Sequence, residues 1–410
     1  MAKTLVVVGG GAAGFFCALT AARLNPALRV LIVEKTGKLL SKVKVSGGGR
    51  CNVTHACFSI PEMIRNYPRG GQLLKKTFHR FFTPDTIQWF GERGAKLKAE
   101  EDGRMFPVSN SSQTIVDCLM EEAAKYKVEI RLHHGIKSLV PIENDTGFNL
   151  YFSNEWTLRA DFLCIASGGY HKSTLFEWIL RTGHTIEAPS PSLFTFNMPE
   201  NSITRLMGIS VPEVQVKISG TSLKENGPLL ITHWGMSGPA ILKLSAWGAR
   251  LLQEKNYHFE ISVNWLPEIR EQSLRDEIQL LRQESGSKKI MHKNPWNLPQ
   301  RLWEWQLEQT GTGDIRWAEL PAAQQNKLVR NLCSQTFSVQ GKTTFKEEFV
   351  TAGGVRLNEI NPQTMESRIH PGLFFAGEVM DADGITGGFN FQQAWTSGFV
   401  AGKSIAEFPG

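Results

Sequence analysis

Apolar runs alternate with helical patterns through the first 170 residues. Thr4–Val8 is a short apolar run that leads into an alanine-rich helical pattern, and Arg29–Glu34 is a second run ending on an acid. Val128–His133 has the alternation of a further strand. Phe148–Ser153 and Trp156–Ala166 alternate and then turn fully apolar, as a hairpin feeding a buried strand would. The order strand, helix, strand, hairpin, strand predicts an α/β fold with a parallel sheet and a small antiparallel excursion.

The pattern changes along the rest of the chain. Residues 60–125 read as largely helical, interrupted by a polar turn at Glu101–Pro107. Pro189–Ser192 marks a boundary, beyond which short strands precede amphipathic helices between about 267 and 335. From Phe345 glycine-dense segments return. These shifts predict a nucleotide-binding domain in two parts, 1–189 and 343–410, interrupted by an inserted β/helical domain at 190–342.

The first strand ends in a glycine-rich turn with the spacing of a dinucleotide site. Gly9 permits the tight turn, Gly11 lets the backbone approach a pyrophosphate, and Gly14 allows close helix–strand packing. Glu34 follows Gly14 by 20 residues, where a carboxylate accepts hydrogen bonds from an adenosine ribose. An acid at this position favours a free 2′-hydroxyl, as in FAD or NAD. The alternative is a plain structural turn.

A second glycine-rich segment near the C-terminus completes the predicted site. Gly372–Glu378 reads as a buried strand ending in glycine and acid, and the loop Asp381–Asn390 follows it. We expect a helix to start near Asn390 as N-cap and its small residues, including Gly398 and Gly402, to lie close to the sheet. The N-terminus of this helix would suit the electron-rich edge of a reduced flavin. The alternative is a turn followed by a core helix.

Composition adds few constraints. The chain has 410 residues, 41% of them hydrophobic and 20% charged, with a formal net charge of +6. A mildly basic surface could suit nucleic acid or an anionic substrate, but a solvated mixed surface explains it as well. Six scattered cysteines form no C-x-x-C pair, and no His/Cys/Asp cluster suggests a metal. With neither a signal-peptide pattern nor a membrane-length apolar run, we expect a cytoplasmic protein.

Four motifs together resemble one known family. They are the Gly9–Gly14 turn, the run Val45–Thr54 (VSGGGRCNVT), the run Thr232–Leu242 (THWGMSGPAIL), and the segment from Gly377 to Gln392 that ends in GGFNFQ. Over essentially its full length the chain resembles the HI0933-like (BaiN/YhiN-type) FAD-dependent flavoproteins. The resemblance implies a Rossmann-like FAD-binding domain of the two-dinucleotide-binding-domain type, built from both ends of the chain, with an inserted β-barrel-like plus helical domain. It implies non-covalent FAD.

The resemblance also implies which residues contact the cofactor. These are Gly9, Gly11, Ala12, Ala13, Gly14, Glu34 and Lys35 on the ADP half; Lys42, Ser46, Gly47, Arg50, Cys51 and Asn52 under the diphosphate and flavin; Ile136 against adenine; Ala166, Ser167 and Gly168 near the ribose; and Gly377, Glu378, Gly388, Asn390, Phe391 and Gln392 at the ribityl chain and ring. The stretch Lys38–Lys44 is unusually lysine-rich, so it leaves open which lysine faces phosphate and which is solvated.

The chemistry is expected to come from the flavin, which takes or gives a hydride at N5. The absence of a dithiol motif argues against a disulfide reductase, and Cys51 is expected to pack beneath the flavin. His233 is the candidate proton donor. Its competing interpretation is a turn residue before the helix that starts at Gly238–Pro239.

We expect NAD(P)H-driven reduction of an activated, enone-type double bond in a small-molecule substrate. The resemblance also allows an oxygen-using oxidase of a small amine or amino ketone, because family members include both an enone reductase and an oxidase of amino ketones. A third class is an RNA-modifying or RNA-binding flavoprotein, or a redox sensor. RNA is less favoured because the only basic stretches, Lys75–Arg80 and Ser287–Lys293, are short. The oligomeric state stays open.

Overall fold

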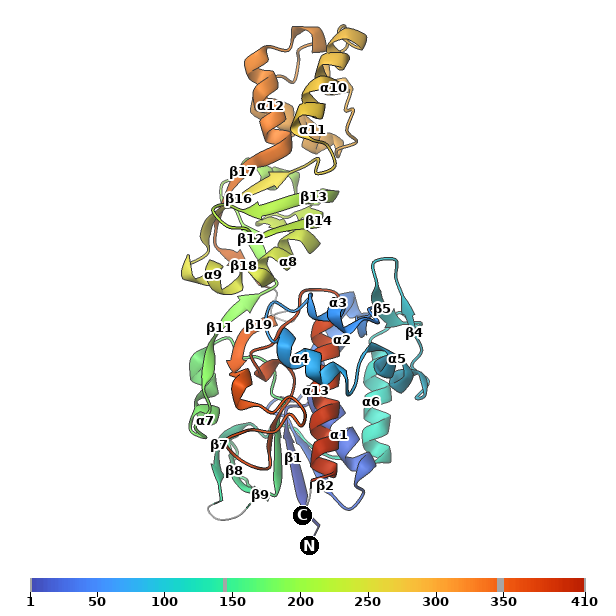
Figure 1. Ribbon diagram of the computed structural model, residues 1–410, viewed down its shortest axis with the longest axis vertical. Helices are drawn as coiled ribbons and strands as arrows, with labels where there is room; N and C mark the ends of the chain where they lie inside the picture. The colour runs from blue at the N-terminus through green and yellow to red at the C-terminus, as the bar shows by residue number, and fades with distance from the viewer. Residues whose placement is uncertain (1, 143–145, 345–349, 409–410) are drawn as a thin grey trace. The chain divides into compact units, whose positions relative to one another are not determined.

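The computed structural model describes residues 2–142, 146–344 and 350–408. It divides the chain into two compact units (Figure 1). Unit 1 contains residues 1–191 and 346–410, and unit 2 contains residues 192–345. The chain therefore leaves unit 1 at 191 and returns at 346, close to the predicted borders at 189 and 343.

Unit 1 is built on a five-stranded sheet in the order β20-β10-β1-β2-β6, with every pair parallel. Its strands are β1 (Thr4–Val8), β2 (Arg29–Val33), β6 (Glu129–Arg131), β10 (Phe162–Ile165) and β20 (Leu373–Phe375). The antiparallel excursion is the sheet of β7 (Ile136–Pro141), β8 (Phe148–Phe152) and β9 (Thr157–Ala160). The parallel sheet and its antiparallel excursion were therefore predicted correctly. The position of β20, a strand from the C-terminal part, beside β10 was not predicted.

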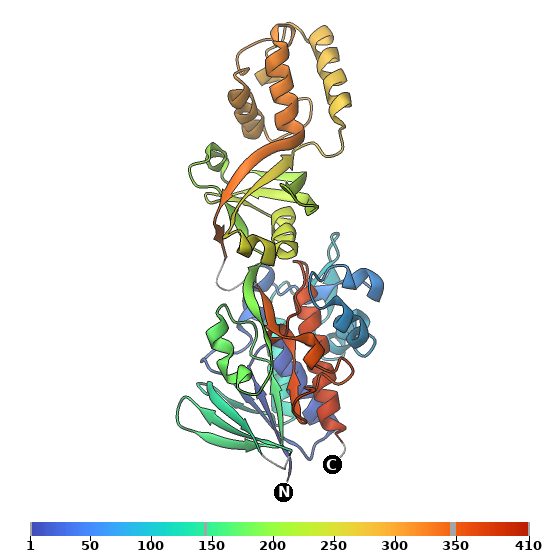
Figure 2. The ribbon, with the colours of Figure 1, turned by 60° about the vertical axis from the view of Figure 1, so that its left-hand side comes forward.

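Helix α1 (Ala12–Leu24) and the C-terminal helix α13 (Phe389–Ala406) lie side by side in unit 1 (Figures 1 and 2). A Cβ on Gly398 would lie 2.4 Å from the Ala13 carbonyl oxygen, and one on Gly402 would lie 2.3 Å from that of Cys17. Only glycine permits so close a backbone approach. The predicted small-residue face is thus real, but its partner is α1; the expectation that it lies against the sheet was wrong.

The remaining elements of unit 1 are short. They are α2 (Ser41–Gly49), β3 (Thr54–His55), α3 (Ile60–Ile64), α4 (Gly71–Phe78), α5 (Thr83–Gly91), β4 (Leu97–Ala99), β5 (Arg104–Pro107), α6 (Gln113–Lys125), α7 (Glu177–Leu180), β11 (Ile186–Ser192) and β19 (Val350–Val355). β3, β5 and β4 form a small antiparallel sheet. The predicted polar turn at Glu101–Pro107 is correct only in its first half, since Arg104–Pro107 is the central strand of this sheet.

Unit 2 contains a seven-stranded antiparallel sheet in the order β17-β16-β13-β14-β15-β12-β18. Its strands are β12 (Thr195–Asn197), β13 (Ser210–Ile218), β14 (Lys224–Ile231), β15 (Gly235–Ser237), β16 (His258–Asn264), β17 (Gln335–Gln340) and β18 (Lys342–Thr343). Only Gly341 separates β17, which pairs with β16, from β18, which pairs with β12. The two ends of the sheet are therefore joined through one nearly continuous strand, as a β-barrel requires.

The helices of unit 2 are α8 (Pro239–Trp247), α9 (Ala249–Glu254), α10 (Glu271–Glu284), α11 (Gln300–Thr310) and α12 (Ala322–Ser334). The last three fall between β16 and β17 and form a bundle beyond that edge of the sheet (Figure 2). Trp303, Trp317 and Leu328 are fully buried in the apolar core of the unit. Within the described ranges, no helix is long and apolar enough to span a membrane.

Candidate functional site

The turn between β1 and α1 has the geometry that each of its glycines was predicted to provide. A Cβ on Gly9 would lie 2.3 Å from the Ala166 carbonyl oxygen, and one on Gly14 would lie 2.0 Å from that of Gly9. A Cβ on Gly11, in contrast, would have nothing within 4 Å. Gly9 and Gly14 are therefore required by packing, whereas Gly11 faces open space at the N-terminus of α1, where no side chain caps the helix.

The carboxylate of Glu34 lies at the end of β2 and is held by three donors. Gly10 N–H donates to Glu34 Oε2 at 3.0 Å, while the Thr36 N–H and hydroxyl both donate to Oε1 at 2.9 Å. These bonds orient the carboxylate beside the glycine turn. The acid that follows Gly14 by 20 residues thus lies beside the glycine turn, where a carboxylate can accept hydrogen bonds from the ribose hydroxyls of a dinucleotide.

A cavity of about 320 Å³ opens beside this carboxylate. Five of its lining residues were predicted from the sequence: Gly9, Glu34, Lys35, Ile136 and Ser167. The sequence did not indicate another part of the wall, which contains the aromatic residues Tyr170 and Trp178, the basic residue Arg181, and Thr174. The Lys35 ammonium lies 5.3 Å from the centre of the Tyr170 ring. Tyr170, Trp178 and Arg181 follow the Ser167–Gly169 loop and belong to no recognisable sequence motif. Their position in the cavity wall therefore depends on the tertiary fold.

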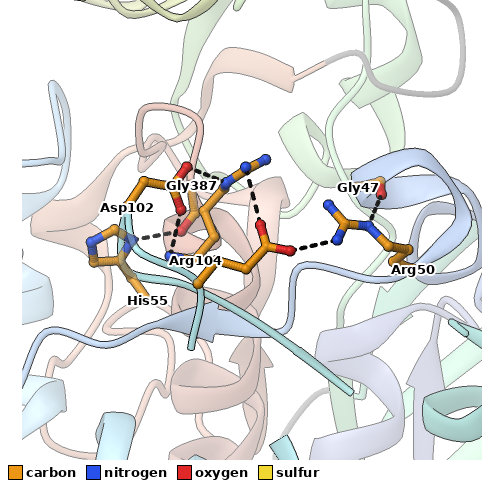
Figure 3. Close-up of polar contacts among 7 residues, drawn as sticks. Gly47, Arg50, His55, Asp102, Arg104 and Gly387 are labelled. Carbon is orange, nitrogen blue, oxygen red and sulfur yellow. Dashed lines mark hydrogen bonds and ion pairs between the residues drawn. The ribbon is translucent and has the colours of Figure 1, made fainter. Parts of the chain in front are cut away.

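The SGGGRCN loop comprises residues Ser46–Asn52. It begins within the last residues assigned to α2, where the backbone is no longer helical. Gly47, Gly48 and Gly49 all have positive φ, and the Cys51 N–H donates to the Ser46 carbonyl at 2.9 Å to close the loop. The Arg50 guanidinium lies 3.9 Å from the centre of the Phe106 ring and 2.5 Å from Glu100. Glu100 also binds Arg104. Arg104 pairs in turn with Asp102 (Figure 3). Arg50 is therefore held against the β3–β5–β4 sheet.

Cys51 itself is fully buried at a positive φ. Burial raises the pKa of its thiol to about 12. A thiol in this state is a packing group and not a nucleophile at neutral pH. The position of Cys51 beneath a bound flavin stays a prediction.

The SGGGRCN loop and the GGFNFQ segment contact each other directly. A Cβ on Gly388 would lie 2.5 Å from the Thr54 carbonyl carbon and oxygen. With its amide oriented to satisfy both neighbours, Asn52 donates to the Thr54 carbonyl and accepts from the Gly388 N–H, each at 3.0 Å. Thr54 donates its hydroxyl to Gln392 Oε1 at 2.6 Å in a buried contact. The two motifs are far apart in sequence but form one structure.

The residues around the end of β20 join the same structure. Lys42 Nζ lies 2.6 Å from Glu378 Oε2, and the other carboxylate oxygen accepts from Thr351 N–H at 2.8 Å. A Cβ on Gly377 would lie 2.8 Å from the Cβ of Ala13, so β20 ends directly against α1. Within the Lys38–Lys44 stretch, Lys42 thus contacts Glu378, a predicted site residue.

The start of α13 differs from the prediction. The N-cap is Gly388, with φ of 94°, and Asn390 lies inside the first turn. The Asn390 side chain accepts from Gly384 N–H and donates to Gly384 C=O, both at 2.8 Å. It therefore fixes the preceding loop and does not cap the helix. Phe391 stacks on Trp395 at 5.6 Å, and Gln392 uses both ends of its amide inside the core.

His55 contributes to the same region. Its Nδ1 lies 3.0 Å from the Gly387 carbonyl oxygen (Figure 3). Its ring stacks on Phe389, with the ring centres 4.6 Å apart. His233, the candidate proton donor, belongs to unit 2. It lies in the turn between β14 and β15, with its ring 4.4 Å from that of Trp234, and α8 begins just after the turn at Pro239. Its role as proton donor stays a prediction.

The described residues fit a bound FAD. Gly11 leaves open space at an uncapped helix N-terminus, which offers N–H groups to a diphosphate. Thr351 Oγ1 is buried beside Gly169 and Glu378 and has no hydrogen-bond partner among the described residues. Such an orphaned buried hydroxyl is expected where a ligand completes the site. The described part of the chain has no group of three or more His, Cys, Asp or Glu that could hold a metal ion.

A parallel sheet whose first turn leaves room for a diphosphate defines a dinucleotide-binding protein of the Rossmann class. The chain belongs to the family described as HI0933-like protein Rossmann domain, whose model matches residues 3–404. This is a family of flavin-dependent oxidoreductases, and it and its structural neighbours are FAD flavoproteins. The predicted family, the α/β fold and the enzyme class are thereby confirmed.

Two curated relatives match the chain from end to end. It is 31% identical over 410 residues to the ribosomal RNA dihydrouridine synthase of Escherichia coli, covering 98% of this chain and 97% of that protein. It is 27% identical over 420 residues to the 3-dehydro-bile acid delta(4,6)-reductase of Clostridium scindens, covering 98% and 99%. The open conformation of a flavocytochrome c3 fumarate reductase matches with a TM-score of 0.52 at 16% identity, covering 99% of this chain and 78% of that one; this likeness concerns the fold alone.

Proposed function

We propose that this protein is an FAD-dependent reductase that converts uridine in ribosomal RNA to dihydrouridine, with NAD(P)H as the electron donor. The observation that carries the proposal is the end-to-end match, at 31% identity, to a ribosomal RNA dihydrouridine synthase. On the sequence alone, RNA is the less favoured substrate class. The match to the ribosomal RNA dihydrouridine synthase leads us to favour RNA over a small-molecule substrate.

The reaction belongs to the class expected from the sequence. The C5–C6 double bond of uracil is conjugated with the C4 carbonyl, so it is an activated, enone-type bond. Its reduction adds a hydride and a proton to uracil, while NAD(P)H loses the hydride and becomes NAD(P)⁺. When bound, FAD supplies the hydride to the substrate from N5. The bile-acid reductase is named for the reduction of a steroid, so both named relatives act by reduction.

The chain's own residues support this chemistry by holding the cofactor at both ends. Glu34 and the cavity that contains Ile136 and Trp178 are suited to bind the adenosine. The contacts of Asn52 and Thr54 with Gly388 fix the two loops that would enclose the flavin ring. Because these loops are tied by buried hydrogen bonds, the ring would be held in one orientation.

The test is a turnover assay with the flavin-loaded protein, NAD(P)H and ribosomal RNA from a strain lacking the modification. Mass spectrometry of the digested RNA should show dihydrouridine at a defined position, and only when NAD(P)H is present. A matched reaction on RNA that already carries the modification should consume no NAD(P)H above background. RNA that stays unmodified while the flavin is reduced would contradict the proposed substrate.

A second candidate function is the reduction of a small-molecule enone. The similarity to the bile-acid reductase favours it. In the same assay, a panel of steroid enones replaces the RNA. Turnover of an enone without turnover of RNA would favour this candidate, whereas oxygen consumption driven by an amine or amino ketone would favour the oxidase alternative.

A further inference from the structure

The positive charge of this protein is concentrated in one stretch. Residues 35–104 contain fourteen Lys and Arg against six Asp and Glu, while the other 340 residues contain thirty-one against thirty-three. The net charge of +6 therefore arises wholly from this stretch. Such asymmetry indicates an anionic partner for the surface that carries it.

Two basic stretches stand out in the sequence, and the structure distinguishes them. In the stretch Ser287–Lys293 of unit 2, Lys289 pairs with Asp314 at 2.5 Å and Lys293 donates to the Ser285 hydroxyl at 2.7 Å. On α4 of unit 1, Lys75 and Lys76 are exposed, and neither pairs with a carboxylate of the described residues. The unit 1 stretch therefore keeps its charge available to a partner.

The inner side of the α3–α4 segment is fastened to the glycine-rich loop of the candidate site. The Tyr67 hydroxyl donates to the Phe389 carbonyl at 2.7 Å, and Arg69 forms a buried ion pair with Asp383. Ile385 N–H donates to the Asn66 carbonyl at 2.9 Å. The exposed side of this segment is therefore held in a fixed place relative to the site loop.

The exposed residues between Phe58 and Arg80 include cations and an aromatic ring. Arg65, Lys75, Lys76 and Arg80 are exposed, and Arg80 contacts only the neutral amide of Gln363 among the described side chains. Phe58, just before α3, is 63% exposed, the highest value for a large apolar side chain in the described ranges. The helix dipole alone would explain the two lysines in the last turn of α4 and Arg65 at the C-cap of α3, but it does not explain Arg80, which lies beyond α4, or an exposed phenylalanine.

We propose that Phe58, Arg65, Lys75, Lys76 and Arg80, here called the basic face, bind the RNA strand that carries the target uridine. The proposal rests on the proposed function and names the surface that would recognise its substrate. The cations contact phosphates and the Phe58 ring stacks on an unpaired base, which is the combination that single-stranded RNA requires. The segment that anchors the basic face also holds the site loop, so a strand bound there is delivered to the flavin side of unit 1.

The test measures binding of the flavin-loaded, full-length protein to a short, fluorescein-labelled, uridine-rich single-stranded RNA over a series of KCl concentrations. K75Q/K76Q should lower the magnitude of the slope of log Kobs against log [KCl] by about 1.4, since two phosphate contacts are lost at about 0.7 each. F58A should weaken binding about 5- to 100-fold at constant salt, and F58W should restore it. The matched control is K217Q/K224Q, which removes two exposed lysines of unit 2.

The possible outcomes distinguish a failure of the basic face from a failure of the proposed function. Flavin content and melting temperature of each variant establish that it is folded. If the parent protein forms dihydrouridine but K75Q/K76Q and F58A bind RNA like the parent, the basic face is wrong and the proposed function stands. Equal losses in K217Q/K224Q, or binding to anionic lipid vesicles in place of RNA, would also overturn the basic face. Absence of dihydrouridine with the parent protein contradicts the proposed function, whatever the binding data show.

Discussion

The guanidinium of Arg69 forms an ion pair with the carboxylate of Asp383, and both groups are withdrawn from solvent, with 10% and 0% of the side chains exposed. The pair joins the α3–α4 connection to the glycine-rich loop before α13. A buried charge that loses its partner has a high desolvation cost. The pair therefore fixes the position of the site loop and makes it sensitive to a change in either residue.

Asp383→Asn should lower the free energy of unfolding by about 3–5 kcal/mol, because it removes a buried carboxylate that compensates the buried Arg69 charge. The control is Asp314→Asn, which breaks the Lys289–Asp314 pair where Asp314 is 85% exposed; its effect should be far smaller, because exposed ion pairs contribute little to stability. Urea denaturation followed by tryptophan fluorescence measures both. Equal effects of the two substitutions would show that burial of the Arg69–Asp383 pair is unimportant.

Gly14→Ala should impair both folding and flavin retention. The new Cβ would lie 2.0 Å from the Gly9 carbonyl oxygen, so α1 must move away from the end of β1. Overpacking of this kind costs about 1–3 kcal/mol. Gly91→Ala is the matched control, because a Cβ there meets nothing within 4 Å. Melting temperature and the 450 nm absorbance of the purified variants provide the measurement, and a Gly14→Ala protein that behaves like Gly91→Ala would contradict the predicted packing.

Glu34→Gln should weaken FAD binding about 10- to 100-fold while leaving the fold intact. The neutral amide of glutamine is a weaker acceptor for the adenosine ribose hydroxyls than the carboxylate, and hydrogen bonds to a charged acceptor contribute about 1.5–3 kcal/mol. Titration of the apoprotein with FAD, followed by quenching of flavin fluorescence, gives the dissociation constant. Glu62→Gln, at an exposed position on α3, should bind FAD like the parent.

Stability should fall in acid because of His184. This side chain is buried between Thr182 Oγ1 and Ser367 Oγ, each 2.7 Å from a ring nitrogen, and burial lowers its pKa from 6.5 to about 4. Glu359 raises this pKa slightly and His370 lowers it, but burial has the largest effect. Between pH 6.5 and about 4 the unfolded chain binds a proton that the folded protein excludes. The free energy of unfolding should therefore decrease by about 3 kcal/mol as the pH falls through this window.

The measurement is a series of urea denaturation curves between pH 7.5 and 4. His184→Gln removes the titrating group, so its stability should depend less on pH within this window even though the variant loses hydrogen bonds. His171→Gln, at an exposed position, should keep the slope of the parent. A His184→Gln protein whose pH profile is parallel to that of the parent would contradict the assignment.

The parts of the fold that depend on local sequence were predictable. Gly9 and Gly14 each allow a close backbone approach that only glycine permits, and Glu34 follows at a distance set by one helix and one strand. The alternation of strand and helix patterns likewise predicted a parallel sheet with a small antiparallel excursion, but it did not predict the order of the strands. The helix start at Asn390 was wrong because Gly388, at positive φ, ends the loop, and the amide of Asn390 binds Gly384 instead.

What the sequence could not give is which surfaces meet. Glycines on one face of α13 indicate a close approach, but α1 and the sheet would satisfy that pattern equally. Trp178 and Tyr170 line the cavity beside Glu34 although nothing near them in the chain resembles a nucleotide motif. Their position depends on how the short helix α7 folds back over the strand ends, which is a tertiary effect.

The packing of α13 on α1 also determines when this protein can acquire its cofactor. The ribosome makes α1 before α13, with the whole of unit 2 between them. A nascent chain that lacks α13 exposes the glycine-contacted side of α1 and has only half of the loop structure around Thr54. A flavin site built from both segments would therefore form only after α13 has been made, and truncation after unit 2 should leave a polypeptide unable to retain FAD.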